Sequence, residues 1–213
     1  MDFLYPDIYD EKDDLYPDRI RQGDVISPEF ITNKNLLPNT VIGWMVINAE
    51  CDLANRDKIN WINFACVRPL DFFIFSILQK NSKLPATPSN TLIQKLRNLV
   101  KQELGNMYFL PEKNDFFEGR GAYVDLGLIF SRPPNIKIGQ KDISVISHLV
   151  KYRMFSLKET WRTELAQHYS LYFGRHGTPD YDKEKFNEWA KEGIQDIINN
   201  FEEISKKFLK SKN

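Results

Sequence analysis

Several residue patterns that mark common functions are absent from this chain. Lysine plus arginine and aspartate plus glutamate number 29 each in 213 residues, so the formal net charge is zero. A strongly basic nucleic-acid binder is therefore not expected, although a local basic patch is compatible with this balance. The longest apolar run, around residues 72–78, is far shorter than the roughly 18 residues of a membrane span. We therefore expect no membrane partner.

Cysteine and histidine are also scarce. The chain has two cysteines and three histidines, and no CxxC or HxxxH spacing occurs. A zinc site is not expected from this inventory, and neither is another cofactor. The first residues are acidic and lack the basic start and apolar run of a signal peptide. We expect a cytoplasmic protein in which both thiols are reduced.

Three segments differ in character. Residues 1–18 contain seven acidic residues and one lysine. This composition predicts an acidic N-terminal arm that packs on the body or, alternatively, an acidic mimic of a nucleic-acid strand. Residues 19–173 predict a barrel-like domain with a helical insertion at 71–106. Residues 174–213 predict a loop followed by an amphipathic helix over about 183–209.

The pattern of residues 19–155 is mainly that of β-structure. Gly23 can take a positive φ in a turn that enters a strand at Asp24. Residues 41–47 are apolar throughout, which predicts a buried central strand. Further strands are expected at 61–67, 107–110, 122–130 and 143–149, and a polar hairpin loop at 54–60. The predicted fold class is mainly β with helices (α+β).

Capping residues predict the helices of the insertion. Asp71 is expected to cap a helix over the following apolar residues. Ser89 or Asn90 is expected to cap a second helix, which ends near Gly105.

A strong helix is expected over residues 156–173. Ser156 and Glu159 fit a capping box at its start. Apolar and aromatic residues then recur at helical spacing, and Gly174 is expected to end the helix.

The first candidate site follows the predicted central strand. Cys51 and Asp52 lie in the polar sequence NAECDL, where a stiff strand end suits binding or catalysis. The thiol of Cys51 is a candidate nucleophile if a base lowers its pKa. The alternative interpretation is a small buried cysteine, with Asp52 capping the loop.

The second candidate site is the sequence GRHGTP that follows the strong helix. Arg175 is a candidate for holding a phosphate or carboxylate, and His176 for moving a proton. The alternative is helix-end chemistry, because cations are favoured at the negative end of the helix dipole.

A basic stretch without acidic residues runs from Lys80 to Lys101. Its central residues Lys95, Arg97 and Lys101 are candidates for contacts with a phosphate backbone. The alternative is a solvated helix face whose lysine stems cover apolar surface.

The opening of the chain resembles the MazF/PemK class of toxins. The resemblance rests on 21–26, the strand at 41–47 and the strand at 61–70, and continues at 123–130 and in the segment from His148 through 173. It covers about residues 20–173 and implies a MazF-like, SH3-like barrel with a toxin–antitoxin or antiviral defence role. At the places of that class's catalytic residues this chain has Asn39-Thr40 and Leu70-Asp71.

A second resemblance is to uncharacterised bacterial proteins that contain Cys-Asp-Leu and Gly-Arg-x-Gly-x-Pro. Here these motifs are residues 51–53 and 174–179. The resemblance implies that the two segments share a site.

Three functions follow as hypotheses. The first is RNA binding or metal-free endoribonuclease cleavage, in which Arg175 stabilises the phosphate and Asp24 or His176 moves protons. The second is an inactive interaction subunit that binds a protein partner through the N-terminal arm and the last helix. The third is a hydrolase dependent on Cys51. Nothing in the sequence indicates an oligomeric state.

Overall fold

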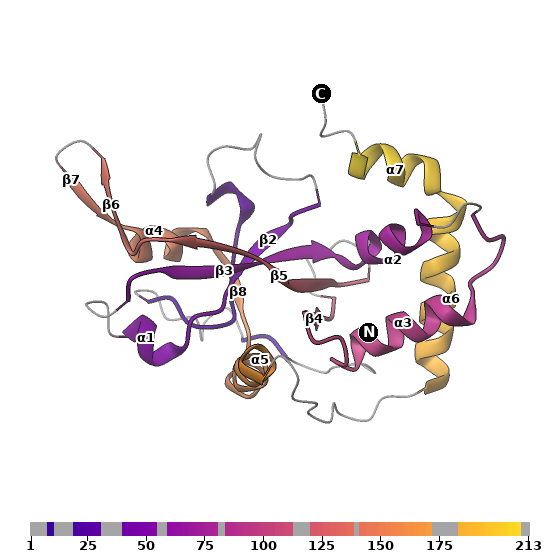
Figure 1. The fold of residues 1–213 in the computed structure, drawn as a ribbon, viewed down its shortest axis with the longest axis horizontal. Helices are drawn as coiled ribbons and strands as arrows, with labels where there is room; N and C mark the ends of the chain where they lie inside the picture. The colour runs from indigo at the N-terminus through magenta and orange to yellow at the C-terminus, as the bar shows by residue number, and fades with distance from the viewer. Residues whose placement is uncertain are drawn as a thin grey trace.

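The computed structural model describes residues 8–10, 19–30, 40–54, 59–80, 84–112, 120–138, 141–171 and 183–209. Within these ranges it shows a six-stranded antiparallel sheet, curled into half a barrel, together with seven α-helices (Figure 1). The α+β class is confirmed, but the expectation of mainly β structure is wrong, because the described helices contain more residues than the described strands. The SH3-like, MazF-like assignment stays a prediction.

The strand order of the sheet is β4-β5-β3-β2-β1-β8. The bounds are β1 (Asp24–Ile26), β2 (Gly43–Val46), β3 (Ile62–Pro69), β4 (Met107–Leu110), β5 (Ala122–Arg132) and β8 (Arg153–Ser156). A separate hairpin joins β6 (Asn135–Ile138) to β7 (Lys141–Ser144). The apolar run at 41–47 contains β2, which is buried and lies inside the sheet as expected.

A bulge separates two halves of the longest strand pair. Ala65 of β3 pairs with Ile129 of β5, whereas the next residue, Cys66, pairs with Asp125. Three residues of β5, 126–128, therefore lie between two consecutive pairs. Such a bulge bends the strand and increases its twist.

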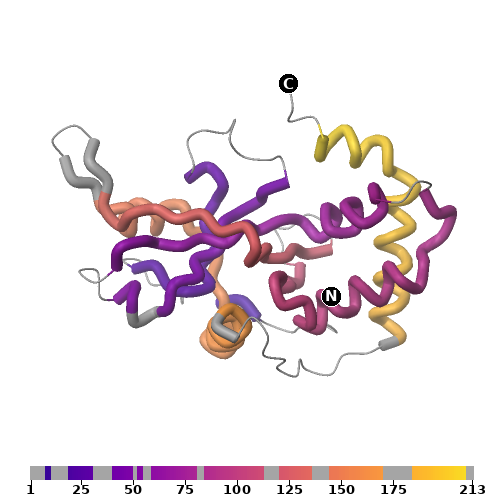
Figure 2. The backbone as a smooth tube through the Cα atoms, viewed as in Figure 1, coloured from indigo at the N-terminus to yellow at the C-terminus, as the bar shows by residue number. Residues whose placement is uncertain are grey.

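The helices cover the two faces of the sheet unequally. They are α1 (Glu50–Ala54), α2 (Leu70–Leu78), α3 (Asn90–Val100), α4 (Val145–Tyr152), α5 (Glu159–Leu171), α6 (Lys183–Asn199) and α7 (Phe201–Leu209), with a 3₁₀ helix, η2 (Pro28–Phe30). Figure 2 shows α2, α3, α6 and α7 gathered at one end of the sheet. No helix in the described part of the chain combines the length and apolarity needed to cross a bilayer.

Alternate residues of strands β1, β2 and β3 belong to two separate cores. Val25 and Met45 belong to the larger core, which includes residues of α2, α3, α6 and α7. Ile26 and Trp44 belong to the smaller core, which includes buried residues of α4. This division follows from the two-residue period of a strand, which places successive side chains on opposite faces.

The strand expected at 143–149 is wrong, because most of this segment is helix α4. Ser144 caps the helix by accepting a hydrogen bond from the Ser147 amide at 3.4 Å. Val145, Ile146 and Leu149 are its buried residues. A short apolar run fits a strand and a buried helix equally well, so periodicity did not distinguish them.

The caps of the insertion are only partly as expected. Ser89 does cap α3, accepting a bond from the Leu92 amide at 3.2 Å. Asp71 does not cap α2, because Pro69 holds that position and the Asp71 carboxylate bonds Arg120 at 3.0 Å. The helix α3 ends at Val100, well before Gly105.

Two further boundaries differ from the sequence-based expectation. Ser156 ends strand β8, and its hydroxyl bonds Asp24, so it does not cap α5, which begins at Glu159. The last helix is two helices, α6 and α7, divided at Asn200, whose side-chain amide donates to the Asp196 carbonyl at 3.0 Å. Of the polar loop expected at 54–60, Ala54 is instead the last residue of α1, and residues 55–58 lie outside the described residues. The expected helix end at Gly174 lies outside the described residues.

Candidate functional site

The sequence-based candidates are only partly within the described structure. Arg175 and His176 lie outside the described residues. Cys51 and Asp52 lie in α1, directly after β2, and Asp52 is exposed. Whether Cys51 and Arg175 share a site is therefore still a prediction.

Asp24, in β1, is fully buried, with 0% of its surface exposed. One carboxylate oxygen accepts from the Arg21 amide at 2.9 Å and from Nη1 of Arg153 at 3.2 Å. The other oxygen accepts from the Ser156 hydroxyl. Burial raises the pKa of Asp24, while the bonds from Ser156 and Arg21 and the charge of Arg153 act in the opposite direction. Proton transfer to a substrate would require this network to open.

The network continues to a second carboxylate, that of Asp10. Its Oδ2 accepts from Nη2 of Arg21 and, at 3.2 Å, from Nη1 of Arg162 in α5. Nη2 of Arg21 also donates to Oγ of Ser156 at 3.1 Å, which links the two carboxylates. Sequence reasoning missed this cluster, because its arginines lie on three separate segments and no local spacing marks them.

Residues 8–10 pair with residues 156–158 and so cover the edge of the sheet at the end of β8. Tyr9 forms an antiparallel bridge with Leu157, and the Asp10 amide donates to the Ser156 carbonyl at 2.9 Å. Ile8 and Tyr9 are buried in the larger core. The Tyr9 hydroxyl donates to the Pro111 carbonyl at 2.7 Å. This part of the N-terminal segment therefore behaves as a short extra strand.

The opposite edge of the sheet is covered only in part. Strand β4 pairs with β5 as far as Asp125. The outer side of β4 is capped in turn by the side chain of Gln102. Its Oε1 accepts from the Phe109 amide at 2.8 Å, and its Nε2 donates to the Phe109 carbonyl at 3.2 Å.

Beyond β4, the outer edge of β5 is open. Among the described residues no strand pairs with the outer side of residues 127–132. Leu128 and Ile129 are 40% and 43% exposed, and Trp61, just before β3, is 55% exposed. Trp61 and Ile129 lie on the same face, because Ile129 pairs with Ala65, four residues after Trp61. The open edge is thus bordered by exposed apolar side chains.

The basic candidates lie on and after α3. Lys95 is exposed. Arg97 donates to Gln94 at 2.9 Å and to Asn187 of α6 at 2.8 Å, and its guanidinium lies 5.8 Å from the centre of the Phe186 ring. The structure therefore gives Arg97 a role in joining α3 to α6. Lys101 forms the C-cap of α3, and nucleic-acid binding by these three residues stays a prediction.

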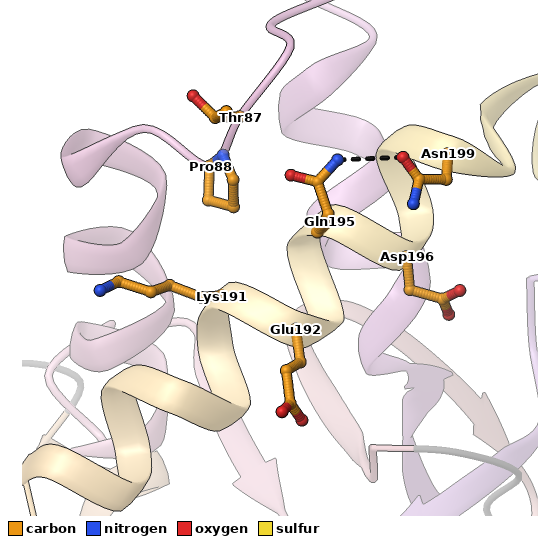
Figure 3. Close-up of a pocket in the computed structure, with 7 residues that line it drawn as sticks. All are labelled: Thr87, Pro88, Lys191, Glu192, Gln195, Asp196 and Asn199. Atoms are coloured by element: carbon orange, nitrogen blue, oxygen red, sulfur yellow. Dashed lines mark hydrogen bonds between the residues drawn. The ribbon is translucent and has the colours of Figure 1, made fainter.

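A surface groove of about 610 Å³ lies between α6 and the segment before α3 (Figure 3). It is lined by Thr87, Pro88, Lys191, Glu192, Gln195, Asp196 and Asn199. Gln195 crosses it, donating to the Ala86 carbonyl at 3.4 Å and to Asn199 at 3.0 Å. The lining contains no cysteine, serine or histidine, and its charges are mixed. It offers one hydroxyl, two amides and opposite charges.

Metal binding and thiol chemistry at Cys66 have little support in the described residues. No group of three or more histidine, cysteine, aspartate or glutamate side chains suited to a metal occurs among them. Cys66 is buried in β3, and burial raises the pKa of its thiol. A buried neutral thiol packs as a small apolar side chain.

Comparison with known proteins found no matching family model, no matching curated protein and no matching solved structure. The resemblance to MazF/PemK toxins, the RNA-directed function and the chemistry of Cys51 therefore stay predictions.

Proposed function

We propose that this chain is a binding protein, and that the open edge of β5 accepts an extended segment of a partner protein. The observation that carries the proposal is the outer side of residues 127–132, which no described strand covers. Every second amide and carbonyl of an edge strand points away from its sheet. An added strand supplies the complementary groups, and this main-chain pairing provides affinity in β-augmentation.

The contrast with the rest of the sheet supports this proposal. Residues 8–10 cover the β8 edge, and Gln102 caps the β4 edge. Natural proteins protect edges because exposed strands pair with other chains. The segment 127–132 instead exposes Leu128 and Ile129 at its edge. A partner strand would cover both the polar and the apolar groups.

Trp61 is suited to anchor such a partner. Tryptophan is enriched among interface residues that contribute strongly to affinity. Between Trp61 and Ile129, on the same face, Oγ of Ser131 donates to Oδ1 of Asn63 at 2.7 Å. The surface therefore combines two apolar side chains with a polar pair. We infer that affinity comes from the apolar side chains and specificity from the polar pair.

The described polar residues offer less for catalysis. Asp24 is fully buried and engaged by three donors. The lining of the groove in Figure 3 contains no cysteine, serine or histidine. These observations favour the interaction subunit over the enzyme hypotheses.

The test selects binding peptides and then locates where they bind. Peptides from a displayed library of cellular protein fragments are selected on the intact chain. Hydrogen exchange then measures which amides each peptide protects, and we expect protection within residues 127–132. The substitutions Ile129→Lys and Trp61→Ala are expected to weaken binding at least about tenfold, since the loss of one anchor corresponds to 1.4 kcal/mol or more.

Leu84→Lys is the matched control. Leu84 is also a large exposed apolar residue, 41% exposed, but lies in the segment before α3. This variant should bind the selected peptides as the original chain does. Peptides that protect other segments, or that bind Ile129→Lys with unchanged affinity, would contradict the proposal.

A further inference from the structure

The covered edge contains a carboxylate that is held by arginines. Asp10 accepts through a single oxygen, Oδ2, from the guanidinium groups of Arg21 and Arg162. Arginine guanidinium groups bind phosphate oxygens by the same charge-assisted hydrogen bonds. Two of them converging on one oxygen therefore form an arrangement that also fits a phosphate group.

The two carboxylates of the network have different surroundings. Asp24 is fully buried and is held by a backbone amide, a hydroxyl and Arg153. The Asp10 side chain is 14% exposed and is held by guanidinium groups. Asp24 thus belongs to the interior of the network, whereas Asp10 is the more exposed of the two carboxylates.

The two arginines have anchors other than Asp10. Nη1 of Arg162 also donates to the Leu157 carbonyl at 2.7 Å. Nη2 of Arg21 also donates to Oγ of Ser156 at 3.1 Å. The stem of Arg162 packs on Gly23, where an added Cβ would lie 3.0 Å from Cγ of Arg162. These contacts orient both guanidinium groups before any anion binds, which reduces the cost of binding.

Main-chain pairing of residues 8–10 positions the Asp10 carboxylate. The Asp10 amide donates to the Ser156 carbonyl, and the Lys158 amide donates to the Ile8 carbonyl, each at 2.9 Å. These bonds hold the Asp10 carboxylate beside the two arginines.

We propose that Arg21 and Arg162 form a binding site for a phosphate group, and that Asp10 fills this site as an internal competitor. A phosphate-bearing ligand binds by displacing the Asp10 carboxylate. The inference is independent of the β5 edge, because it concerns the opposite side of the sheet.

The test compares the original chain with Asp10→Asn, which removes the charge and keeps the size of the side chain. Inorganic phosphate and a short single-stranded RNA are titrated separately at constant ionic strength. We expect Asp10→Asn to bind at least one of them about tenfold more tightly than the original chain. A gain with both ligands assigns the phosphate group itself, and a gain with RNA alone assigns a phosphodiester strand.

Three further variants test whether the gain in affinity arises specifically from removing the Asp10 charge. Adding Arg162→Gln to Asp10→Asn should remove the gain, and Asp10→Glu should not show it because the carboxylate is kept. Asp196→Asn is the matched control. It removes one of two carboxylates from another arginine, Arg120, which also bonds Asp71. This control should bind neither ligand more tightly.

A second measurement uses the original chain and does not depend on the folding of a variant. Phosphate should accelerate hydrogen exchange of the Asp10 amide, which is bonded to Ser156. Chloride at the same ionic strength should not. A folded Asp10→Asn that gains affinity for neither ligand would overturn the proposal, and so would an Asp10 amide whose exchange phosphate leaves unchanged.

Discussion

The two edges of the sheet are built in opposite ways. At β8 the edge is covered by residues 8–10, whose apolar side chains enter the core and whose Asp10 joins a buried ionic network. At β5 the edge beyond Asp125 is uncovered among the described residues and carries exposed Leu128 and Ile129. Within the described residues the same sheet therefore has one edge that is paired at its end and one that is exposed, at which we propose that a partner binds.

The difference between the edges also shows how an edge is protected. Residues 8–10 satisfy main-chain groups and bury apolar surface together, whereas Gln102 satisfies only the amide and carbonyl of Phe109. The bulge at 126–128 interrupts the regular pairing next to Asp125, which pairs with Met107, the first residue of β4. A bulge limits indiscriminate pairing by twisting the strand, so the open edge is accessible without being a flat template.

The same isoleucine-to-alanine substitution should reduce stability far more at the covered edge than at the open edge. Ile8→Ala should lower the free energy of unfolding by about 3 kcal/mol, because it leaves a cavity in the core. Ile129→Ala should lower it by about 0.5 kcal/mol or less, because the side chain already contacts water. Ile8 is 2% exposed and Ile129 is 43% exposed. Urea unfolding of both variants measures the difference, and equal losses would show that the edges are not energetically distinct.

Removing the Gln102 side chain should have the next largest effect on stability. Gln102→Ala removes both bonds to Phe109 and leaves two buried backbone groups without them, at a cost of about 2 kcal/mol. Gln102 also has a φ of 56°, so Gln102→Gly loses the cap but relaxes the backbone. The glycine variant should therefore be more stable than the alanine variant by about 1 kcal/mol. Thermal unfolding compares the two, and the reverse order would exclude a backbone contribution.

The pH dependence of stability tests the network at the covered edge. Because burial raises the pKa of Asp24 above its ordinary value of 3.8, the folded chain retains a proton there that the unfolded chain loses. The contribution of Asp24 is thus greatest below pH 3.8 and decreases as pH rises through its folded pKa. Asp24→Asn should remove this part of the pH dependence. Urea unfolding of the original chain and of Asp24→Asn across this acidic range measures the difference. If the stability of both proteins changed with pH in parallel, Asp24 would not be the group responsible.

The smallest effect on stability is expected for Trp61, which lies on the exposed surface beside the open edge of β5. Trp61→Ala should change the free energy of unfolding by no more than about 0.5 kcal/mol, although it deletes the largest side chain, because Trp61 is 55% exposed. Urea unfolding measures this change. A loss above about 2 kcal/mol would mean that Trp61 supports the fold, and the interface assignment would then lose its anchor.

Part of the fold could be predicted because the relevant signals are local. The strand 107–110 was expected with its observed bounds, and Ser89 caps α3 through an amide three residues away. By contrast, the apolar residues of 143–149 are too few to define a period, and the sequence favours a strand where the structure has a helix. The Ser156–Glu159 pattern predicts a capping box, but the hydroxyl of Ser156 bonds Asp24 instead. A distant partner competes with a local cap, and the sequence does not show which one wins.

Local sequence signals suffice to predict helices mixed with strands, the buried strand β2 and the turn at Gly23, which has a φ of 80°. Each depends on residues within a few positions of one another. Which edge of the sheet is covered depends on long-range contacts. The contacts that decide it join Asp10 to Arg162 and Gln102 to Phe109. Asp10 reaches Arg162 only because folding brings the N-terminal segment beside β8 and α5, so no spacing along the chain could reveal that pair.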